Sequence, residues 1–239
     1  NNEHSFLSYC GGLSDVPNDF CYKFSWSPLG VLKALMSTSV SIRNGDIFTV
    51  TKPWESVELY PLPMPWGEDE FEVYPNRDSL PFIDQYQMDD GLKIKQFVRG
   101  TLRYKGWKNA WGDIFSEVDT LDASIAEARL KEISDDLWDR YSYMDGEVDR
   151  VILTVELKVE NDTEVVWHKQ YLMDTLGNDN GSAMAQLVSC SVALAVEAVI
   201  GNEISSGVTA APHQSKLVTR WLDQAEDISD HFVLIDHLN

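Results

Sequence analysis

The sequence predicts an α+β protein in which helices cover a mixed, largely antiparallel sheet. Apolar and polar residues alternate along residues 151 to 159, as in a strand, and after a turn at 160 to 162 the chain is expected to return as the partner strand at 163 to 173. Apolar residues recur at helical spacing in residues 122 to 143 and 215 to 226. Because strands and helices are intermixed and at least two hairpins are indicated, the α+β class follows.

In the first half of the chain, turn and capping signals separate short elements. Paired glycines at 11 and 12 are expected to let the backbone turn sharply. Ser27-Pro28 can start a helix, and residues 43 to 46 indicate a hairpin. The expected order is a strand at 5 to 9, a helix at 29 to 36, short strands around 43 to 46, and an extended, irregular proline-rich segment at 53 to 67. After it come a turn at 74 to 79, whose Asp78 or Ser79 can cap a helix, and a strand at 93 to 99.

In the second half, longer elements are expected. Trp107 and Trp111 belong to a helix that follows Gly100, and an acidic amphipathic helix covers residues 122 to 143. Ser182 can cap the next helix. The remaining order is the hairpin of residues 151 to 173, a loop at 177 to 181, a helix at 183 to 200 that is apolar on nearly all sides and ends at Gly201, a helix at 215 to 226 and a strand at 232 to 235.

The composition limits the classes of partner. The 239 residues carry 19 basic and 39 acidic side chains, a net charge of -20. A field of this sign repels phosphate backbones, so no nucleic-acid partner is expected. The charge fits a cationic partner or a solubilised surface, and the second interpretation is favoured. No run of 18 apolar residues is present, so no membrane-spanning segment is expected.

Cysteine, histidine and short catalytic motifs leave the function open. Cys10, Cys21 and Cys190 are odd in number and widely spaced, which favours a reducing, cytoplasmic location. The five histidines are scattered, so no metal site is expected. The sequence contains no G-x-G-x-x-G dinucleotide fingerprint, P-loop, G-x-S-x-G elbow or H-E-x-x-H motif.

Three segments combine turn residues with side chains that can bind a carboxylate. Residues 8 to 13 place a thiol at the end of a strand, beside backbone amides at which a carboxylate can dock. The alternative is a buried structural cysteine. Arg77, Arg99 and Arg103 lie near glycines or turns, and guanidinium groups bind carboxylates bidentately. The alternative is that these arginines pair with acidic side chains of the protein, such as Asp78.

Five blocks, taken in order, resemble the glutamate-forming saccharopine dehydrogenase (saccharopine reductase) family. They are SYCGGL at 8 to 13, YKFSWSP at 22 to 28, YPNRDS at 74 to 79, RGTLRYKG at 99 to 106 and NGSAMA at 180 to 185. Residues 107 to 170 do not align except as a helix followed by a hairpin. Leu29 stands where the family often has a basic residue, which leaves the exact substrate open.

The resemblance implies an oxidoreductase of lysine metabolism. Such an enzyme oxidises a secondary amine to an imine with NAD(P), and water then hydrolyses the imine. The implied substrate, saccharopine, has three carboxylates, which suits an arginine-rich cleft. Cys10 is the implied catalytic candidate, mainly as a positioning group. The implied substrate-binding residues are Gly11, Gly12, Leu13, Tyr22, Trp26, Arg77, Arg99, Arg103, Asn180 and Gly181.

Family members begin with a Rossmann domain, and this sequence starts without Met or a dinucleotide motif. We therefore expect a fragment that neither binds NAD(P) nor turns over substrate alone. Residues 1–176 are expected to form the substrate-binding domain and residues 177–239 a helical return segment that would complete the Rossmann domain. A cytoplasmic homodimer is expected. The alternatives are a non-catalytic binding or dimerisation module, and a dehydrogenase of an opine-like or carboxynorspermidine-type amine.

Overall fold

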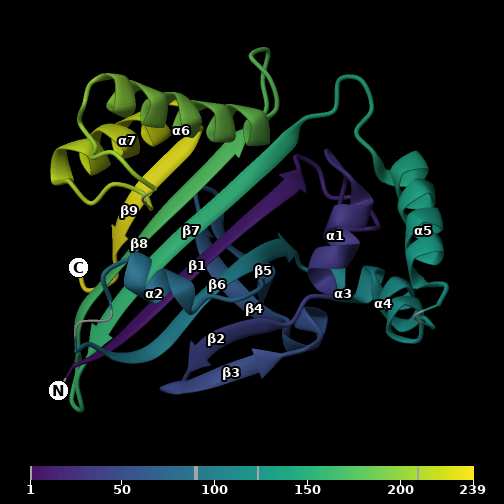
Figure 1. Ribbon diagram of the computed structural model, residues 1–239, viewed down its shortest axis with the longest axis horizontal. Helices are drawn as coiled ribbons and strands as arrows, with labels where there is room; N and C mark the ends of the chain where they lie inside the picture. Colours follow the sequence, from purple (N-terminus) through teal and green to yellow (C-terminus); the bar gives the residue numbers. More distant parts are fainter. Residues whose placement is uncertain (1, 89–90, 123, 209) are drawn as a thin grey trace.

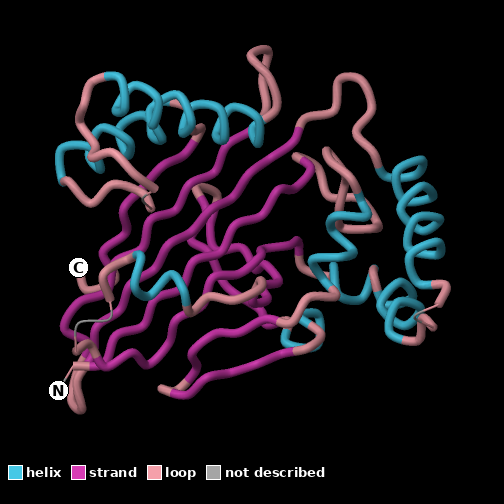
Figure 2. The backbone as a smooth tube through the Cα atoms, in the orientation of Figure 1, coloured by secondary structure: helices cyan, strands magenta, loops and turns pink. Residues whose placement is uncertain are grey.

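One large mixed sheet dominates the computed structural model, which describes residues 2–88, 91–122, 124–208 and 210–239. Helices lie over parts of the sheet and flank it on one side (Figures 1 and 2). The predicted α+β class is confirmed. The strands are β1 (Glu3–Ser14), β2 (Ser39–Arg43), β3 (Asp46–Val50), β4 (Glu58–Met64), β5 (Gly67–Pro75), β6 (Lys93–Tyr104), β7 (Asp149–Glu160), β8 (Val165–Leu176) and β9 (His231–Asp236).

The strand order places the N-terminal strand at the centre of the sheet. The order is β3-β2-β6-β1-β7-β8-β9, and β5 pairs with β6 and with β4. β1 runs parallel to β6 and antiparallel to β7, and the other pairs are antiparallel. β1 and β6 therefore lie side by side although some 90 residues separate them (Figure 1). Side chains of β1 and β6 that share a face can form one site.

The glycines in these strands correct one prediction. Gly11 and Gly12 lie inside β1, not at a turn, and Gly100 lies inside β6. A β-carbon on Gly11 would lie 2.6 Å from the carbonyl oxygen of Leu102. A β-carbon on Gly100 would lie 2.7 Å from the ring of Tyr9. These glycines permit close packing of neighbouring strands instead of a change in chain direction.

The proline-rich segment is more regular than predicted. After a short 3-10 helix, η1 (Pro53–Ser56), the chain forms β4 and returns in β5. Pro61 and Pro63 are exposed, whereas Leu62 and Met64 alternate with them and are buried. β4 has β5 as its paired neighbour and lies at an edge, where a missing backbone N–H is tolerated. The predicted extended chain is confirmed for β4, but the predicted irregularity is wrong there.

Signals of local origin are confirmed more closely. Asn44 and Gly45 both have positive φ, 52° and 83°, and join β2 to β3 as a hairpin. β7 and β8 pair along nearly their whole length. Ser182 accepts a hydrogen bond from the N–H of Ala185 at 3.2 Å and so caps the apolar helix α6 (Ala183–Ile200).

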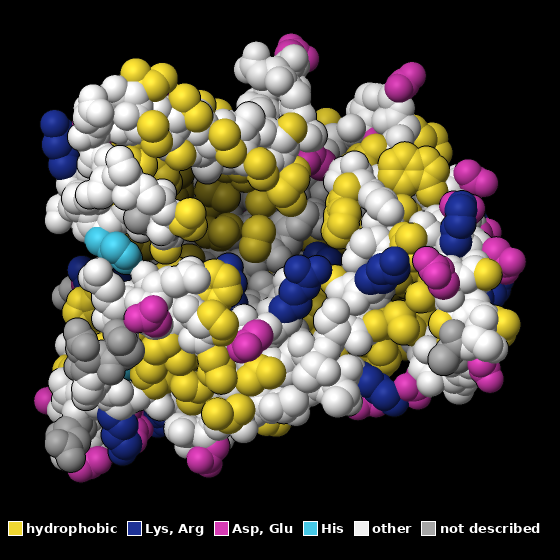
Figure 3. Space-filling model, viewed as in Figure 1, with side chains coloured by type: hydrophobic (Ala, Val, Ile, Leu, Met, Phe, Trp, Pro, Cys, Tyr) yellow, Lys and Arg dark blue, Asp and Glu magenta, His cyan; other side chains and the backbone are white. Residues whose placement is uncertain are grey.

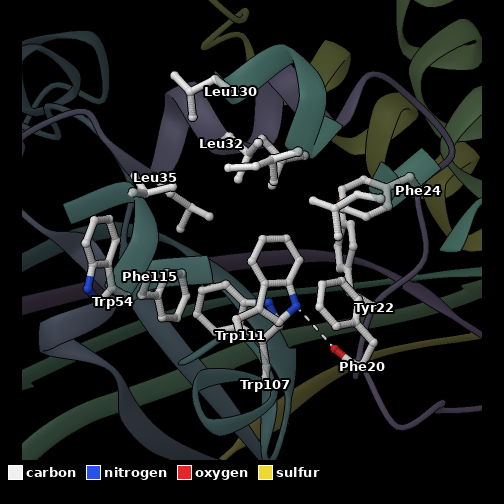
Figure 4. Packing of buried hydrophobic residues seen from close by; sticks show 14 of the residues in the cluster. Phe20, Tyr22, Phe24, Leu32, Leu35, Trp54, Trp107, Trp111, Phe115 and Leu130 are labelled. Carbon is white, nitrogen blue, oxygen red and sulfur yellow. Dashed lines mark hydrogen bonds between the residues drawn. The ribbon is translucent and has the colours of Figure 1, made fainter. Parts of the chain in front are cut away.

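An aromatic cluster holds the helices that flank one end of the sheet. These are α1 (Pro28–Leu35), α3 (Trp107–Ala110), α4 (Gly112–Asp119) and α5 (Ala126–Tyr141). Trp107 and Trp111 are fully buried at its centre, and the indole N–H of Trp111 donates to the carbonyl of Phe20 at 3.2 Å (Figure 4). Tyr22 belongs to the same cluster, so one wall of the cavity described below is anchored in a rigid core.

The two faces of the sheet carry different cores. Ile152 and Leu172 belong to the core of one face, which the β4–β5 hairpin covers. Val151 and Met173 point to the other face and pack against Ala183 of α6. α2 (Pro81–Gln85) lies over the sheet, and α7 (Ser215–Asp227) lies beside α6 (Figure 1).

α6 exposes most of its apolar surface. Ala183, Leu194 and Ala198 are buried, whereas Val188, Val192 and Val196 are each more than half exposed. By length and composition α6 could cross a bilayer, which differs from the prediction that no segment could. A single helix of this kind is weak evidence for a membrane span, because a helix that packs inside a protein has the same composition.

Candidate functional site

A cavity of about 390 Å³ opens on the sheet face that also carries α6 and α2. Hydrophobic side chains floor a hollow on this face, and Lys and Arg side chains gather beside it (Figure 3). The cavity is lined by Ser8, Cys10, Gly12, Leu13, Tyr22, Lys23, Ser25, Trp26, Asn76, Arg99, Gly100, Thr101, Arg103, Tyr143, Asp149, Leu153 and Met184.

The cavity owes its polar side to the parallel pairing of β1 and β6. Alternate residues of a strand point to the same face, so Cys10 is accompanied by Ser8 and Gly12. The same alternation brings Arg99 and Arg103 of β6 into the cavity. The register pairs Ser8 with Arg99, which places the thiol of β1 and the guanidinium groups of β6 along one wall.

Arg103 is a buried cation without an acidic partner among the residues that the structure describes. The residue is 7% exposed. Its guanidinium carbon lies 4.7 Å from the ring centre of Tyr22 and within 6 Å of those of Tyr74 and Trp107. One N–H donates to the carbonyl of Leu102 at 3.0 Å, and Nε has no hydrogen-bond partner. Burial of an unpaired charge is costly, so the site is suited to an anionic ligand.

Arg99 is held in place through both its backbone and its side chain. Its guanidinium carbon lies 3.5 Å from the ring centre of Phe82 in α2. Its backbone N–H donates to the hydroxyl of Ser79 at 3.0 Å. Ser79 therefore supports Arg99 and does not cap α2. Asp78 accepts the N–H of Leu80 at 2.9 Å, but Leu80 itself stands at the N-cap position of α2 and makes no side-chain cap hydrogen bond. No described carboxylate lies within ion-pair distance of this guanidinium.

Cys10 is a thiol that opens on the cavity. Desolvation raises the pKa of Cys10, and the positive charge of Arg103 partly offsets that rise. The group is therefore a neutral thiol at pH 7, which can donate a weak hydrogen bond but is a poor nucleophile. This protonation state fits a group that orients a ligand.

The remaining predicted residues divide into those inside the cavity and those outside it. Gly12, Leu13, Tyr22 and Trp26 line it together with Cys10, Arg99 and Arg103. Arg77 has a positive φ of 55° and lines an adjoining cavity of about 250 Å³. Trp26, Asn76, Thr101 and Arg103 line both cavities, so they form the wall between them.

Three predicted residues lie elsewhere. Gly11 faces the opposite side of β1, against Leu102. Gly181 lines a third cavity of about 850 Å³, and Asn180 is exposed in the turn before it, where its N–H donates to the side chain of Asn178. The prediction that these residues contact a ligand stays a prediction.

Several lining residues were not predicted. Lys23 and Asn76 lie inside the sequence blocks that carry the resemblance. The charge of Lys23 and the polar amide of Asn76 could therefore have marked them as candidate binding residues. Tyr143 and Asp149 come from the region between residues 107 and 170, where no motif could be read. Asp149 is buried and accepts the N–H groups of Ala183 and Met184 at 2.7 and 3.1 Å, so it links β7 to the first turn of α6.

The comparison that decides the family covers nearly the whole chain. The family model described as saccharopine dehydrogenase C-terminal domain matches residues 1–228. The chain belongs to the saccharopine dehydrogenase C-terminal domain family. In a member of this family the α+β sheet described above is the expected architecture, and the resemblance read from the five sequence blocks is confirmed.

Similar proteins agree with this assignment. The chain is 28% identical over 286 residues to saccharopine dehydrogenase [NADP(+), L-glutamate-forming] of Pyricularia oryzae, covering 89% of this chain and 62% of that protein. It is 38% identical over 110 residues to mitochondrial alpha-aminoadipic semialdehyde synthase of Mus musculus, covering 44% of this chain and 11% of that protein. The chain therefore spans less than two thirds of the length of either relative.

A solved structure shows the same fold. Apo saccharopine dehydrogenase (L-Glu forming) from Saccharomyces cerevisiae matches 97% of this chain and 67% of its own, with a TM-score of 0.73 and 25% identity. The match in three dimensions therefore agrees with the assignment of this chain to the saccharopine dehydrogenase C-terminal domain family. The whole sheet and the flanking helices take part in the match, since nearly every residue of the chain is covered.

The residues of this chain do not fit a nicotinamide dinucleotide. The sequence has no G-x-G-x-x-G spacing, and the paired glycines at 11 and 12 lie within a strand instead of between a strand and a helix. We therefore assign no cofactor-binding residue within this saccharopine dehydrogenase C-terminal domain. In the residues that the structure describes, no group of three or more potential ligands could hold a metal ion.

Proposed function

We propose that this chain is the substrate-binding part of an oxidoreductase that acts on the secondary amine of a multi-carboxylate amino acid of the saccharopine type. The nicotinamide cofactor, NADP in the name of the Pyricularia oryzae relative, would be held by another part of the protein. The observation that carries the proposal is Arg103: a buried guanidinium without a described acidic partner lines one cavity with Arg99 and Cys10.

The two arginines account for ligand binding by charge. Each guanidinium can donate two N–H bonds to one carboxylate, and both lie in a site whose aromatic walls reduce screening by water. Leu153 and Met184, which pack together on this face of the sheet, add an apolar part to the lining. An amino acid with carboxylates at its ends and an aliphatic middle matches this division. Cys10 would lie along that middle section and orient it.

The residues beyond the cavity extend the proposal. The exposed face of α6 would pack against the cofactor-binding part, and Asp149 would fix α6 relative to the cavity. We also propose the division into residues 1–176 and 177–239, with the qualification that β9 of the second unit extends the sheet of the first. A homodimer, a cytoplasmic location and inactivity of the isolated chain remain proposals of the same kind.

Binding of saccharopine by variants tests the proposal. We expect saccharopine to raise the melting temperature of the purified protein, and Arg103→Met or Arg99→Met to weaken its binding by at least about tenfold, because loss of one partner of a buried charge pair costs about 2 to 5 kcal/mol. Arg140→Met is the matched control, since Arg140 pairs with Asp136 on the exposed face of α5. Unchanged binding in both arginine variants would overturn the proposal.

The two alternatives predict different results in the same assay. A non-catalytic binding module would bind saccharopine, but the complete protein would not oxidise it with NADP. A dehydrogenase of an opine-like or carboxynorspermidine-type amine would bind that amine more tightly than saccharopine. Binding and oxidation of each of these ligands by the complete protein therefore distinguish the proposed function from both alternatives.

A further inference from the structure

Lys23 is a third cation in the cavity. Its side chain is 13% exposed and lines the cavity together with Arg99 and Arg103. The residues on either side, Tyr22 and Phe24, are buried in the aromatic cluster, so the backbone that carries Lys23 is fixed. Three cations therefore face one cavity in a protein with a net charge of -20.

Lys23 differs from the two arginines because it has a carboxylate partner. Its ammonium group binds both carboxylate oxygens of Glu147, in the connection between α5 and β7. One of these oxygens also accepts the N–H of Met144 at 2.8 Å. Glu147 itself lines the neighbouring cavity of about 850 Å³ and not the one that holds the arginines. Lys23 thus reaches Glu147 across the wall between the two cavities.

We propose that Lys23 is a third carboxylate-binding group and that Glu147 competes with the ligand for it. This inference rests on the proposed function, because it assumes that a multi-carboxylate amino acid occupies the cavity. The Glu147 carboxylate stands in for a ligand carboxylate when the cavity is empty. A ligand with three carboxylates then meets three cations, one of which must first be released from Glu147.

The side-chain chemistry suits this division of roles. Arg103 is fixed among three rings and Arg99 lies against Phe82, so neither can turn far. An ammonium group on a flexible four-carbon stem can reorient between two partners at little cost. The competing pair is also weak enough to exchange, because Glu147 is 37% exposed and partly solvated ion pairs contribute little stability.

Saccharopine binding to Lys23→Met, Glu147→Gln and the double variant, measured by calorimetry on the purified protein, tests this competition. We expect Lys23→Met to weaken binding by about tenfold, as for the loss of one charged contact. Glu147→Gln should strengthen binding several-fold, because the competitor has lost its charge. In the Lys23→Met background, Glu147→Gln should change nothing.

A purely structural ion pair gives a different pattern. In that case both single variants weaken saccharopine binding and lower the melting temperature together, and this result would overturn the inference. Equal binding by Glu147→Gln and the unchanged protein would overturn it as well. If saccharopine binds and Arg103→Met weakens it while Lys23→Met has no effect, the competition fails and the proposed function stands. If saccharopine does not bind at all, the proposed function fails.

Discussion

The guanidinium carbon of Arg103 lies 4.7 Å from the ring centre of Tyr22, in a pocket where no described carboxylate neutralises its charge. The contact between the guanidinium and the aromatic ring offsets part of the hydration free energy that Arg103 loses on folding, but not all of it. In the proposed function, binding of an anionic ligand accounts for a site that costs the free protein some stability.

Arg103→Met should therefore raise the free energy of unfolding by about 1 kcal/mol while it removes ligand binding. Urea unfolding without ligand is the measurement. Arg43→Met is the control: Arg43 also lies over a ring, that of Phe48, but is paired with Glu58. The control should lose stability slightly. A clear loss of stability in Arg103→Met would mean that its contacts within the protein outweigh its unpaired charge.

Cys10 should react slowly with iodoacetamide at pH 7, since burial raises the pKa of its thiol above the ordinary 9.0 and Arg103 partly counters the rise. The measurement uses the double variant Cys21→Ser/Cys190→Ser, so that Cys10 is the remaining thiol. Its alkylation rate should increase with pH, with a midpoint above 9.0. Arg103→Met should move the midpoint higher still, because the pKa loses the influence of the nearby positive charge. Rapid alkylation near neutrality would contradict a neutral thiol.

Gly100→Ala should destabilise the protein by about 1 to 3 kcal/mol. The added β-carbon would lie 2.5 Å from the carbonyl oxygen of Tyr74 and 2.7 Å from the ring of Tyr9, and both belong to packed strands. Gly112→Ala is the matched control, because no heavy atom lies within 4 Å of its β-carbon at the start of α4. The control should gain up to about 1 kcal/mol. Thermal melts of both variants give the comparison.

Asp174→Asn should cost about 3 to 5 kcal/mol, because it leaves the buried guanidinium of Arg150 without its counter-charge. The two side chains are each 9% exposed and form two bonds, of 2.7 and 2.6 Å. Asp135→Asn, which breaks the exposed pair with Lys131, should cost no more than about 0.5 kcal/mol. Similar losses in urea unfolding for the two variants would show that burial does not govern the strength of the first pair.

Glu160 should contribute to stability at neutral pH and cease to do so in acid. Lys158 and Lys95 lower the pKa of Glu160 from 4.5 to about 2. The folded form therefore binds a proton less readily than the unfolded form, and the contribution is complete above about pH 5 and is lost as the pH falls toward 2. Because the partners Lys95 and Lys158 are each about a third exposed and water screens their charges, the contribution is about 1 kcal/mol or less.

Urea unfolding of Glu160→Gln checks this pH dependence. The variant should be less stable than the unchanged protein at pH 7, and the difference should disappear near pH 2. Glu164→Gln, for which no ion pair is described, should show no such trend. A difference that grows as the pH falls would contradict the lowered pKa of Glu160.

Elements with local signals could be predicted from the sequence. The positive φ angles of Asn44 and Gly45, the alternation of β7 with the turn that joins it to β8, and the Ser182 cap of α6 all depend on residues close together in the chain. The family could also be read from short blocks, since they come from the strands and turns that surround the cavity.

Features that depend on distant contacts could not be predicted. Gly11 and Gly12 were predicted to turn the chain, and the strand at 93 to 99 was predicted to end before Gly100, but all three glycines lie in strands next to another packed segment. The prolines at 61 and 63 argued against a regular strand in the sequence, although a strand at the edge of a sheet tolerates proline. The environment of Arg103 is set by Tyr22 and Trp107, which lie far from each other in sequence, so its lack of an acidic partner becomes visible only in three dimensions.

The aromatic cluster also provides an optical signal. Trp107 and Trp111 are shielded from water, so their fluorescence should be emitted at short wavelength and resist quenching by iodide. Trp26 is 52% exposed on the cavity wall and should emit at longer wavelength and be quenched readily. Trp66, Trp138 and Trp167 are exposed as well, outside this cavity. Once these three are replaced by phenylalanine, the buried indoles should report melting of the helical end and Trp26 should report occupancy of the cavity, without any added dye.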